Sequence, residues 1–263
     1  MESILKQMVR LLSLIALVYG CCGESQVCTV PECITNTSHL SILETRKILM
    51  GYNCINKKDL SGKVFTIPTN DANPYIKLHA NINKPITAMT MCQRFNSGLE
   101  RGQTLFSLAT KSADNELMLY KSSLGTYRVH VRLRSLDFFN LPDGINEWIS
   151  LCWTWDSKTG LTQLWLNGKR SARRVISPHG TITGEPSIVL GQDQDTYGGG
   201  FDPNQSFVGD VTDVHFWDKV LSPCDIKYYM HGQIKSPGNL LNWEALQFTT
   251  NGKVFIEKSD FIC

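Results

Sequence analysis

The sequence predicts an all-β protein, a sandwich or barrel of antiparallel strands that carries one short helix. From residue 57 onward the chain consists of short β-like runs separated by turn residues, and this regular spacing is typical of antiparallel sheet. In the same region, residues 222–232 have both a start and a stop signal for a helix. A chain of 263 residues is long enough to form one such domain with a sizeable core.

The first 23 residues are predicted to be a secretory signal peptide. Lys6 and Arg10 precede an apolar stretch at 11–19, and the small residues Gly20 and Gly23 each permit cleavage, which is expected after Gly23. The stretch is too short to span a bilayer, and no later run approaches the roughly 18 apolar residues that a transmembrane helix needs. The mature protein is therefore expected to be secreted and extracellular, with no transmembrane segment.

Residues 24–57 are predicted to be a cysteine-containing extension ahead of a domain at 58–263. The extension is polar, and its segment 38–50 is either a helix or a partly ordered tail. Secretion makes the cysteines disulfide candidates rather than zinc ligands. The mature chain keeps an odd number of them, so at least one thiol is free or paired to another chain: Cys28, Cys33, Cys54, Cys92, Cys152, Cys224 and Cys263.

Eleven segments of the domain are predicted to be strands because each is rich in β-branched and aromatic residues and is bounded by turn residues. They are 63–68, 75–80, 86–95, 103–110, 116–121, 126–133, 147–155, 161–168, 187–191, 211–218 and 253–258.

Three local patterns refine this prediction. Alternation in 147–155 places Ile149, Leu151, Trp153 and Trp155 on one face and Cys152 on the other. Asn167-Gly168 predicts a tight hairpin, because both residues tolerate positive φ. Ser222 is the expected N-cap of the helix, with Pro223 at its first position, and Gly232 ends it.

The segment 191–210, GQDQDTYGGGFDPNQSFVGD, is the candidate functional loop. It gathers four carboxylates and four amides around the run Gly198-Gly199-Gly200. Calcium takes six to eight oxygen ligands from carboxylates, amides and backbone carbonyls, and glycines let a loop fold around the ion. The same composition also occurs in solvated turns, and the spacing does not match an EF-hand. The loop lies between β-like segments, which predicts a site carried by strands.

Three motifs in order resemble the pentraxins, and the short pentraxins in particular. They are SLCWTWDSKTG at 150–160, the loop at 191–210 and FWDKVLSPCDI at 216–226, within a match from Asp59 to Lys258. The resemblance implies a flattened jelly-roll sandwich of lectin type, assembled as a homo-oligomeric ring that is usually pentameric. It also implies two adjacent calcium ions on one face of each subunit.

The resemblance also assigns roles to residues. The implied metal ligands are Asp114, Asn115, Asp193, Gln194 through its backbone carbonyl, Asp195, Asp202 and Gln205. Asp193 and Asp202 stand where relatives often carry Glu, whose arm is longer. The implied ligand-binding residues are Tyr120, Asn115 and Gln205. The implied disulfide joins Cys92 to Cys152, and Ser150 stands where the family signature has His.

The expected function is that of a secreted, calcium-dependent, lectin-type binding protein, not an enzyme. Its ligands are expected to be carbohydrates of galactoside type or phosphate-bearing groups. With 26 basic and 24 acidic residues, the charge gives no indication of nucleic-acid binding. Asn36 and Asn204 begin glycosylation sequons.

Two alternative functions remain open. One is phosphocholine binding in innate-immune pattern recognition, although Arg134 and Ser135 lie where phosphocholine-binding members have a Glu for the choline cation. The other is a jelly-roll glycoside hydrolase, which needs two carboxylates beside a sugar bond. Asp193 and Asp195 are suitably spaced for that reaction, but calcium binding already accounts for them.

Overall fold

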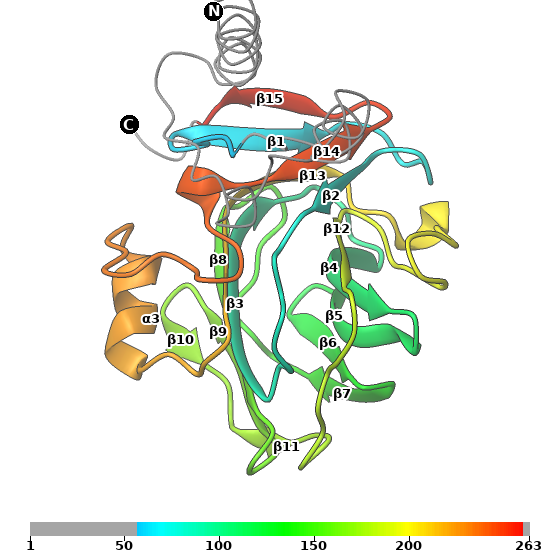
Figure 1. The fold of residues 1–263 in the computed structure, drawn as a ribbon. Helices are drawn as coiled ribbons and strands as arrows, with labels where there is room; N and C mark the ends of the chain where they lie inside the picture. Colours follow the sequence, from blue (N-terminus) through cyan, green and yellow to red (C-terminus); the bar gives the residue numbers. More distant parts are fainter. Residues whose placement is uncertain (1–56, 260–263) are drawn as a thin grey trace, which may run out of the picture. The chain divides into compact units, whose positions relative to one another are not determined.

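The computed structural model describes residues 57–259, which form two antiparallel β-sheets packed face to face (Figure 1). The chain divides into two units at residue 56, and the description concerns the second. The first sheet contains, in spatial order, β10 (Lys169–Arg170), β9 (Leu161–Leu166), β8 (Ile149–Asp156), β3 (Ala88–Asn96), β13 (Gly209–Trp217), β1 (Lys63–Ile67) and β15 (Phe255–Lys258), and β11 (Arg174–Val175) also pairs with β9.

The second sheet supplies the other half of the sandwich. In spatial order it contains β14 (Phe248–Asn251), β2 (Tyr75–Leu78), β12 (Ser187–Leu190), β4 (Gln103–Thr110), β5 (Ala113–Ser123), β6 (Thr126–Val131) and β7 (Arg134–Phe138). Strands far apart in sequence, such as β1 and β13, are neighbours, as expected for a jelly roll. The predicted all-β, jelly-roll sandwich with one short helix is confirmed for the described residues.

Each of the eleven predicted segments contains a strand, but their bounds differ in informative ways. In the segment 126–133 the strand, β6 (Thr126–Val131), ends at Val131 because Arg132 and Leu133 form a turn, with φ of 51° and 63°. Asn167 and Gly168 both have positive φ between β9 and β10, which confirms the hairpin. Strands β7, β10, β11 and β14 were not predicted. They are short, lie at sheet edges and are largely exposed, so they lack a clear apolar alternation.

The core lies between the two sheets and shows the predicted alternation. Ile149, Leu151, Trp153 and Trp155 on β8 all belong to the central apolar cluster. Both indole N–H groups are satisfied there, since Trp153 donates to Thr162 Oγ1 at 2.8 Å and Trp155 to the carbonyl of Ile176 at 3.1 Å. Burial of these two rings therefore leaves no indole N–H group without a hydrogen-bond partner.

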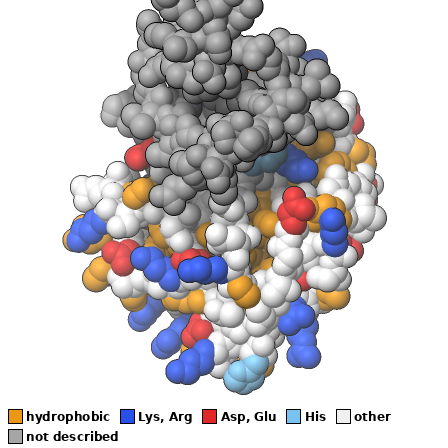
Figure 2. Space-filling view, in the orientation of Figure 1, with side chains coloured by type: hydrophobic (Ala, Val, Ile, Leu, Met, Phe, Trp, Pro, Cys, Tyr) orange, Lys and Arg blue, Asp and Glu red, His pale blue; other side chains and the backbone are white. Residues whose placement is uncertain are grey.

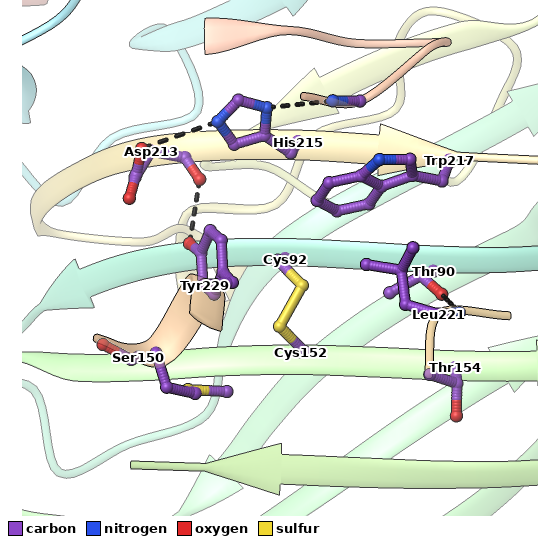
Figure 3. The surroundings of a disulfide bond; sticks show 12 residues. Thr90, Cys92, Ser150, Cys152, Thr154, Asp213, His215, Trp217, Leu221 and Tyr229 are labelled. Carbon is purple, nitrogen blue, oxygen red and sulfur yellow. Dashed lines mark hydrogen bonds and ion pairs between the residues drawn. A yellow bond between two sulfur atoms is a disulfide. The ribbon is translucent and has the colours of Figure 1, made fainter. Parts of the chain in front are cut away.

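The outer face of the first sheet is covered by α3 (Pro223–Met230). Ser222 caps this helix by accepting from the Asp225 N–H, and Pro223 follows it, as predicted. Beneath the helix a disulfide joins Cys92 on β3 to Cys152, its register partner on β8 (Figure 3). The predicted disulfide is confirmed. Cys224, in the first turn of the helix, is an exposed free thiol.

A buried arginine ties the helix to the same sheet. Arg94 on β3 donates through Nε to Asp213 Oδ2 at 2.8 Å and through its other nitrogens to Ser150 Oγ and the carbonyl of Tyr229. His215 Nε2 lies 3.5 Å from the other oxygen of Asp213 (Figure 3). Burial alone would raise the pKa of Asp213, but hydrogen bonds from His215 and Arg94 lower it. Ser150 therefore belongs to a packing network.

Candidate calcium site

The loop at 191–208 follows β12 and is fastened to the second sheet by one side chain. Gln194 Nε2 donates to the carbonyls of Ser107 on β4 and Ser187 on β12, at 3.2 and 3.0 Å. Its Oε1 accepts from the Gly198 N–H at 3.0 Å. Because this amide is fully engaged in the loop's own structure, the backbone carbonyl is the group that Gln194 can offer to an ion. The predicted role of Gln194 is consistent with this arrangement.

The glycine run lets the loop reverse within a few residues. Thr196 and Gly199 exchange two backbone hydrogen bonds, at 3.0 and 3.2 Å. Gly198 and Gly200 have φ of 78° and 76°, a conformation that costs other residues free energy. The base of the loop is closed by a bond from the Phe207 N–H to the Gly191 carbonyl at 2.9 Å. The loop thus has a defined shape built from its own backbone.

The second half of the loop is a short 3-10 helix, η3 (Pro203–Gln205), which begins at Asp202. Asp202 Oδ1 accepts from both the backbone and the side chain of Asn204, at 2.9 and 3.0 Å. Arg101 supports this turn from another part of the chain, because it donates to the carbonyls of Asn204 and Ser206 at 3.1 and 2.9 Å. Arg101 was not among the residues predicted from the sequence.

The remaining candidate ligands come from the start of β5. Asp114 Oδ1 accepts from the Asn115 N–H at 2.8 Å, and the Asn115 carbonyl accepts from the Leu133 N–H at 3.0 Å. The turn between β6 and β7 therefore holds Asn115 in place. The fold thus places carboxylates that are about 80 to 90 positions apart in sequence within electrostatic range of one another.

The charges of neighbouring carboxylates raise the pKa of Asp193 and of Asp195. Asp193 is buried, and its pKa is raised to about 7, first by burial and then by the charges of Asp195 and Asp114. The pKa of Asp195 is also raised, by burial and by Asp114 and Asp202. Four acids within electrostatic range and without a compensating cation are unfavourable. Such an arrangement suits a bound cation.

Three of the candidate ligands carry side-chain oxygens that are buried and have no hydrogen-bond partner among the described residues. These oxygens are Asn115 Oδ1, Asp193 Oδ1 and Gln205 Oε1. A buried polar atom without a partner costs about 1–3 kcal/mol, so native structures rarely tolerate several together. Carboxylate and amide oxygens are the donors that calcium prefers. The residues present therefore fit calcium.

Within residues 57–259 no three Asp, Glu, His or Cys side chains are close enough together to hold a metal by themselves. This finding agrees with the donor set, because a site that depends on Asn115, Gln205 and a backbone carbonyl does not consist of carboxylates alone. Nitrogen and sulfur donors suited to zinc are not part of this site.

Tyr120 lies on β5 beside the loop and is half buried. Its pKa is raised first by burial, and the charges of Asp193 and Asp202 contribute to the rise. Its hydroxyl packs against Gly102, where a Cβ atom would lie 2.0 Å away. The hydroxyl end of Tyr120 therefore contacts the residue before β4, and the side chain lies within electrostatic range of Asp193 and Asp202.

The two predicted glycosylation acceptors stay predictions. Asn204 is exposed in η3, and its amide nitrogen donates to Asp202, a candidate calcium ligand. Asn36 lies outside the described residues.

An antiparallel sandwich with an oxygen-rich loop on one sheet and a helix on the other defines a class of protein, the calcium-dependent lectin-type binding proteins. The profile of the Pentaxin family matches residues 63–258, and the chain belongs to this family. Pentraxins are calcium-dependent ligand-binding proteins of innate immunity rather than enzymes, and the resemblance predicted from three motifs is confirmed.

Relatives and solved structures give the extent of the similarity. The chain is 40% identical over 198 residues to serum amyloid P-component of Mus musculus, covering 75% of this chain and 88% of the relative. It is 39% identical over 205 residues to C-reactive protein of Sus scrofa, covering 78% and 91%. The native heptameric SAP-like pentraxin from Limulus polyphemus has a similar fold, with a TM-score of 0.69 and 22% identity, covering 77% of this chain and 97% of that one.

Proposed function

We propose that this protein is a secreted lectin-type pentraxin that holds its ligand through two calcium ions per subunit. The metal ligands of the proposal are Asp114, Asn115, Asp193, the carbonyl of Gln194, Asp195, Asp202 and Gln205. The proposal also divides the chain into three parts: a signal peptide at 1–23, an extension at 24–57 and a pentraxin domain at 58–263. The observation that carries the proposal is the set of buried oxygens without partners on Asn115, Asp193 and Gln205.

The bound ions would supply positive charge that accepts ligand oxygens directly, without any reaction on the ligand. The residues of the chain do the rest. Gln194 and Arg101 hold the loop, while Tyr120 offers an apolar face to sugar carbons. Asn115 and Gln205 carry amide groups that can also donate to ligand oxygens.

The ligand class follows from what lies beside Tyr120. A quaternary ammonium needs an acid or an open aromatic cage nearby. The residue at 135 is Ser, and the next acid on β7, Asp137, already pairs with Arg128 at 2.7 and 2.9 Å. Galactoside-like carbohydrates or phosphate-bearing groups therefore fit better than phosphocholine, which stays the second candidate because members of the same family bind it.

Assembly and export complete the proposal. The relatives include serum proteins by name, and the similar Limulus protein is a heptamer. Among the described residues no helix is long and apolar enough to cross a membrane. We infer a secreted homo-oligomeric ring, with five subunits as the size that the short pentraxins suggest.

Substitution of one carboxylate tests the metal site. Asp195→Ala should abolish calcium binding in a calorimetric titration and retention on a galactoside column, because the other ligands cannot complete the coordination. Asp218→Ala, which changes an exposed aspartate after β13, is the matched control and should behave as wild type. Unchanged calcium binding by Asp195→Ala would remove this loop from the site.

Elution from the same column tests the ligand class. Chelator and free galactoside should release the protein, and phosphocholine should do so only at higher concentration. If phosphocholine competes at much lower concentration than any sugar, phosphocholine replaces the galactoside as the proposed ligand.

A further inference from the structure

A segment near the start of the domain contacts the candidate calcium loop at its beginning, middle and end. This segment, residues 70–75, leads from β1 into β2 and is called the brace below. Strands β2 and β12 are neighbours in the second sheet, and the calcium loop follows β12 (Figure 1). Because these strands are antiparallel, with Ile76 opposite Leu190, the brace ends beside the point where the loop begins.

The brace holds the beginning and the middle of the loop. Gln192 is fully buried, and its Nε2 donates to the carbonyls of Asp71 and Pro74 at 2.7 and 3.0 Å. The ring of Phe201 packs against that of Tyr75, with centroids 4.8 Å apart. Each of these two loop residues stands one position before a carboxylate of the proposed site. The brace therefore fixes the chain directly before two candidate ligands.

Asn70 acts at the end of the loop. Its Oδ1 accepts from Arg101 Nη2 at 2.6 Å and from the hydroxyl of Ser206 at 2.8 Å. The same arginine donates through Nη1 to the carbonyls of Asn204 and Ser206. Those two residues flank Gln205, whose Oε1 is buried and has no hydrogen-bond partner among the described residues. Asn70 thus orients the arginine that holds the chain on both sides of this candidate ligand.

The brace also has support that does not involve the calcium loop. Asn251, the last residue of β14, donates through Nδ2 to both the carbonyl and the Oδ1 of Asn73, each at 2.8 Å. Asp71 Oδ1 accepts from the Asn73 N–H at 3.1 Å. Because these bonds do not use Asn70, its replacement leaves the rest of the brace in place.

Asn70 can be replaced without disturbing the core or the charge of the domain. Its side chain is exposed and neutral. Figure 2 shows acidic and basic side chains interspersed on the visible face, so a variant that changed charge could alter cation binding through the field alone. A neutral substitution at this position therefore isolates the effect of positioning.

We propose that Asn70 is a positioning residue for calcium, which acts through Arg101 and Ser206 to keep Gln205 aimed at the ion. This proposal rests on the proposed calcium site and extends it to a residue that is not a ligand. Residues that orient metal ligands typically change metal affinity by about 10–100-fold when they are replaced. A clamp formed before binding also reduces the conformational freedom that the loop loses when it takes up the ion.

Calcium titration by calorimetry and urea unfolding in chelator together test this role. Asn70→Ala should weaken calcium affinity about tenfold and leave the urea midpoint in chelator unchanged. Asn70→Asp, which keeps an oxygen acceptor for Arg101, should restore the affinity. Asn83→Ala, which changes an exposed asparagine between β2 and β3, is the matched control and should behave as wild type in both assays.

The outcomes separate this role from the calcium site itself. If Asn70→Ala binds calcium as wild type does, or if Asn70→Asp fails to restore the affinity, the positioning role is wrong and the calcium site stands. If the affinity falls together with the urea midpoint in chelator, Asn70 supports the fold rather than the ligand, and the positioning role is again overturned. If wild type binds no calcium, the proposed site and the positioning role are both overturned.

Discussion

Asp193 links proton binding, calcium binding and stability, and Asp193→Asn tests that link. Its pKa is about 7 in the folded chain and 3.8 in a reference peptide. Because the folded value is raised, the protonated form is the stabilising one. That stabilisation is fully present below the unfolded pKa and is lost as the pH rises from about 4 to about 7. Above that range the folded protein without calcium carries a buried charge on Asp193, whose Oδ1 has no hydrogen-bond partner among the described residues.

The size of the effect follows from the two pKa values. A gap of about three pH units corresponds to about 4 kcal/mol at 1.36 kcal/mol per unit. In chelator at about pH 8, Asp193→Asn should therefore be more stable than wild type by about 3–4 kcal/mol, because the amide cannot ionise. In calcium the order should reverse, since wild type gains binding energy that the variant lacks.

Urea unfolding at matched protein concentration measures both effects. In chelator, wild type should lose about 3 kcal/mol between about pH 5 and pH 8, and Asp193→Asn should not. Calcium affinity of wild type should fall by up to tenfold for each pH unit below about 7, because binding displaces a proton. A variant that is less stable than wild type in chelator at the higher pH would refute this account of Asp193.

Three further predictions concern the rest of the chain. Replacing Cys92 and Cys152 with Ala should lower the free energy of unfolding by about 4 kcal/mol, the loop-closure value for a sequence separation of 60, as measured by urea unfolding. Arg94→Met should cost about 3–5 kcal/mol in the same assay, since it leaves the Asp213 carboxylate without its arginine. Non-reducing electrophoresis of secreted protein should reveal bands of linked subunits that disappear on reduction, through cysteines outside the described residues such as Cys263; a monomer band alone would contradict this.

The sequence predicted the strands that have a buried face and also the exposed edge strand β15, but it missed the short edge strands β7, β10, β11 and β14. In β8 every second side chain enters the core, so the apolar alternation is strong enough to recognise. Strand β7, RSLDF, has exposed or half-buried residues at four of its five positions and is held by its pairing with β6. A strand defined by its neighbour rather than by its own burial leaves little pattern in the sequence.

At the candidate site, the sequence predicted the loop but not the residues that hold the loop in place. Oxygen donors and glycines occur together at 191–210, which left a calcium loop and a solvated turn open, and the pentraxin resemblance favoured calcium. Arg101 bonds to the carbonyl of Asn204, 103 positions away, and backbone carbonyls have no residue type that a pattern could recognise. The orientation of Arg128 was also not predictable from the sequence, because it depends on which residue of β7 pairs with Arg128.

The loop's framework and its candidate ligands use largely different atoms, and this separation explains how the site can exist before the ion binds. Gln194 fastens the loop with its side chain, and Phe207 closes its base through the backbone. Arg101 holds the second half through carbonyls. The oxygens left without partners are on Asn115, Asp193 and Gln205. Because the framework bonds do not require these oxygens, we expect that removal of calcium leaves the fold in place and exposes only the electrostatic strain of the acids.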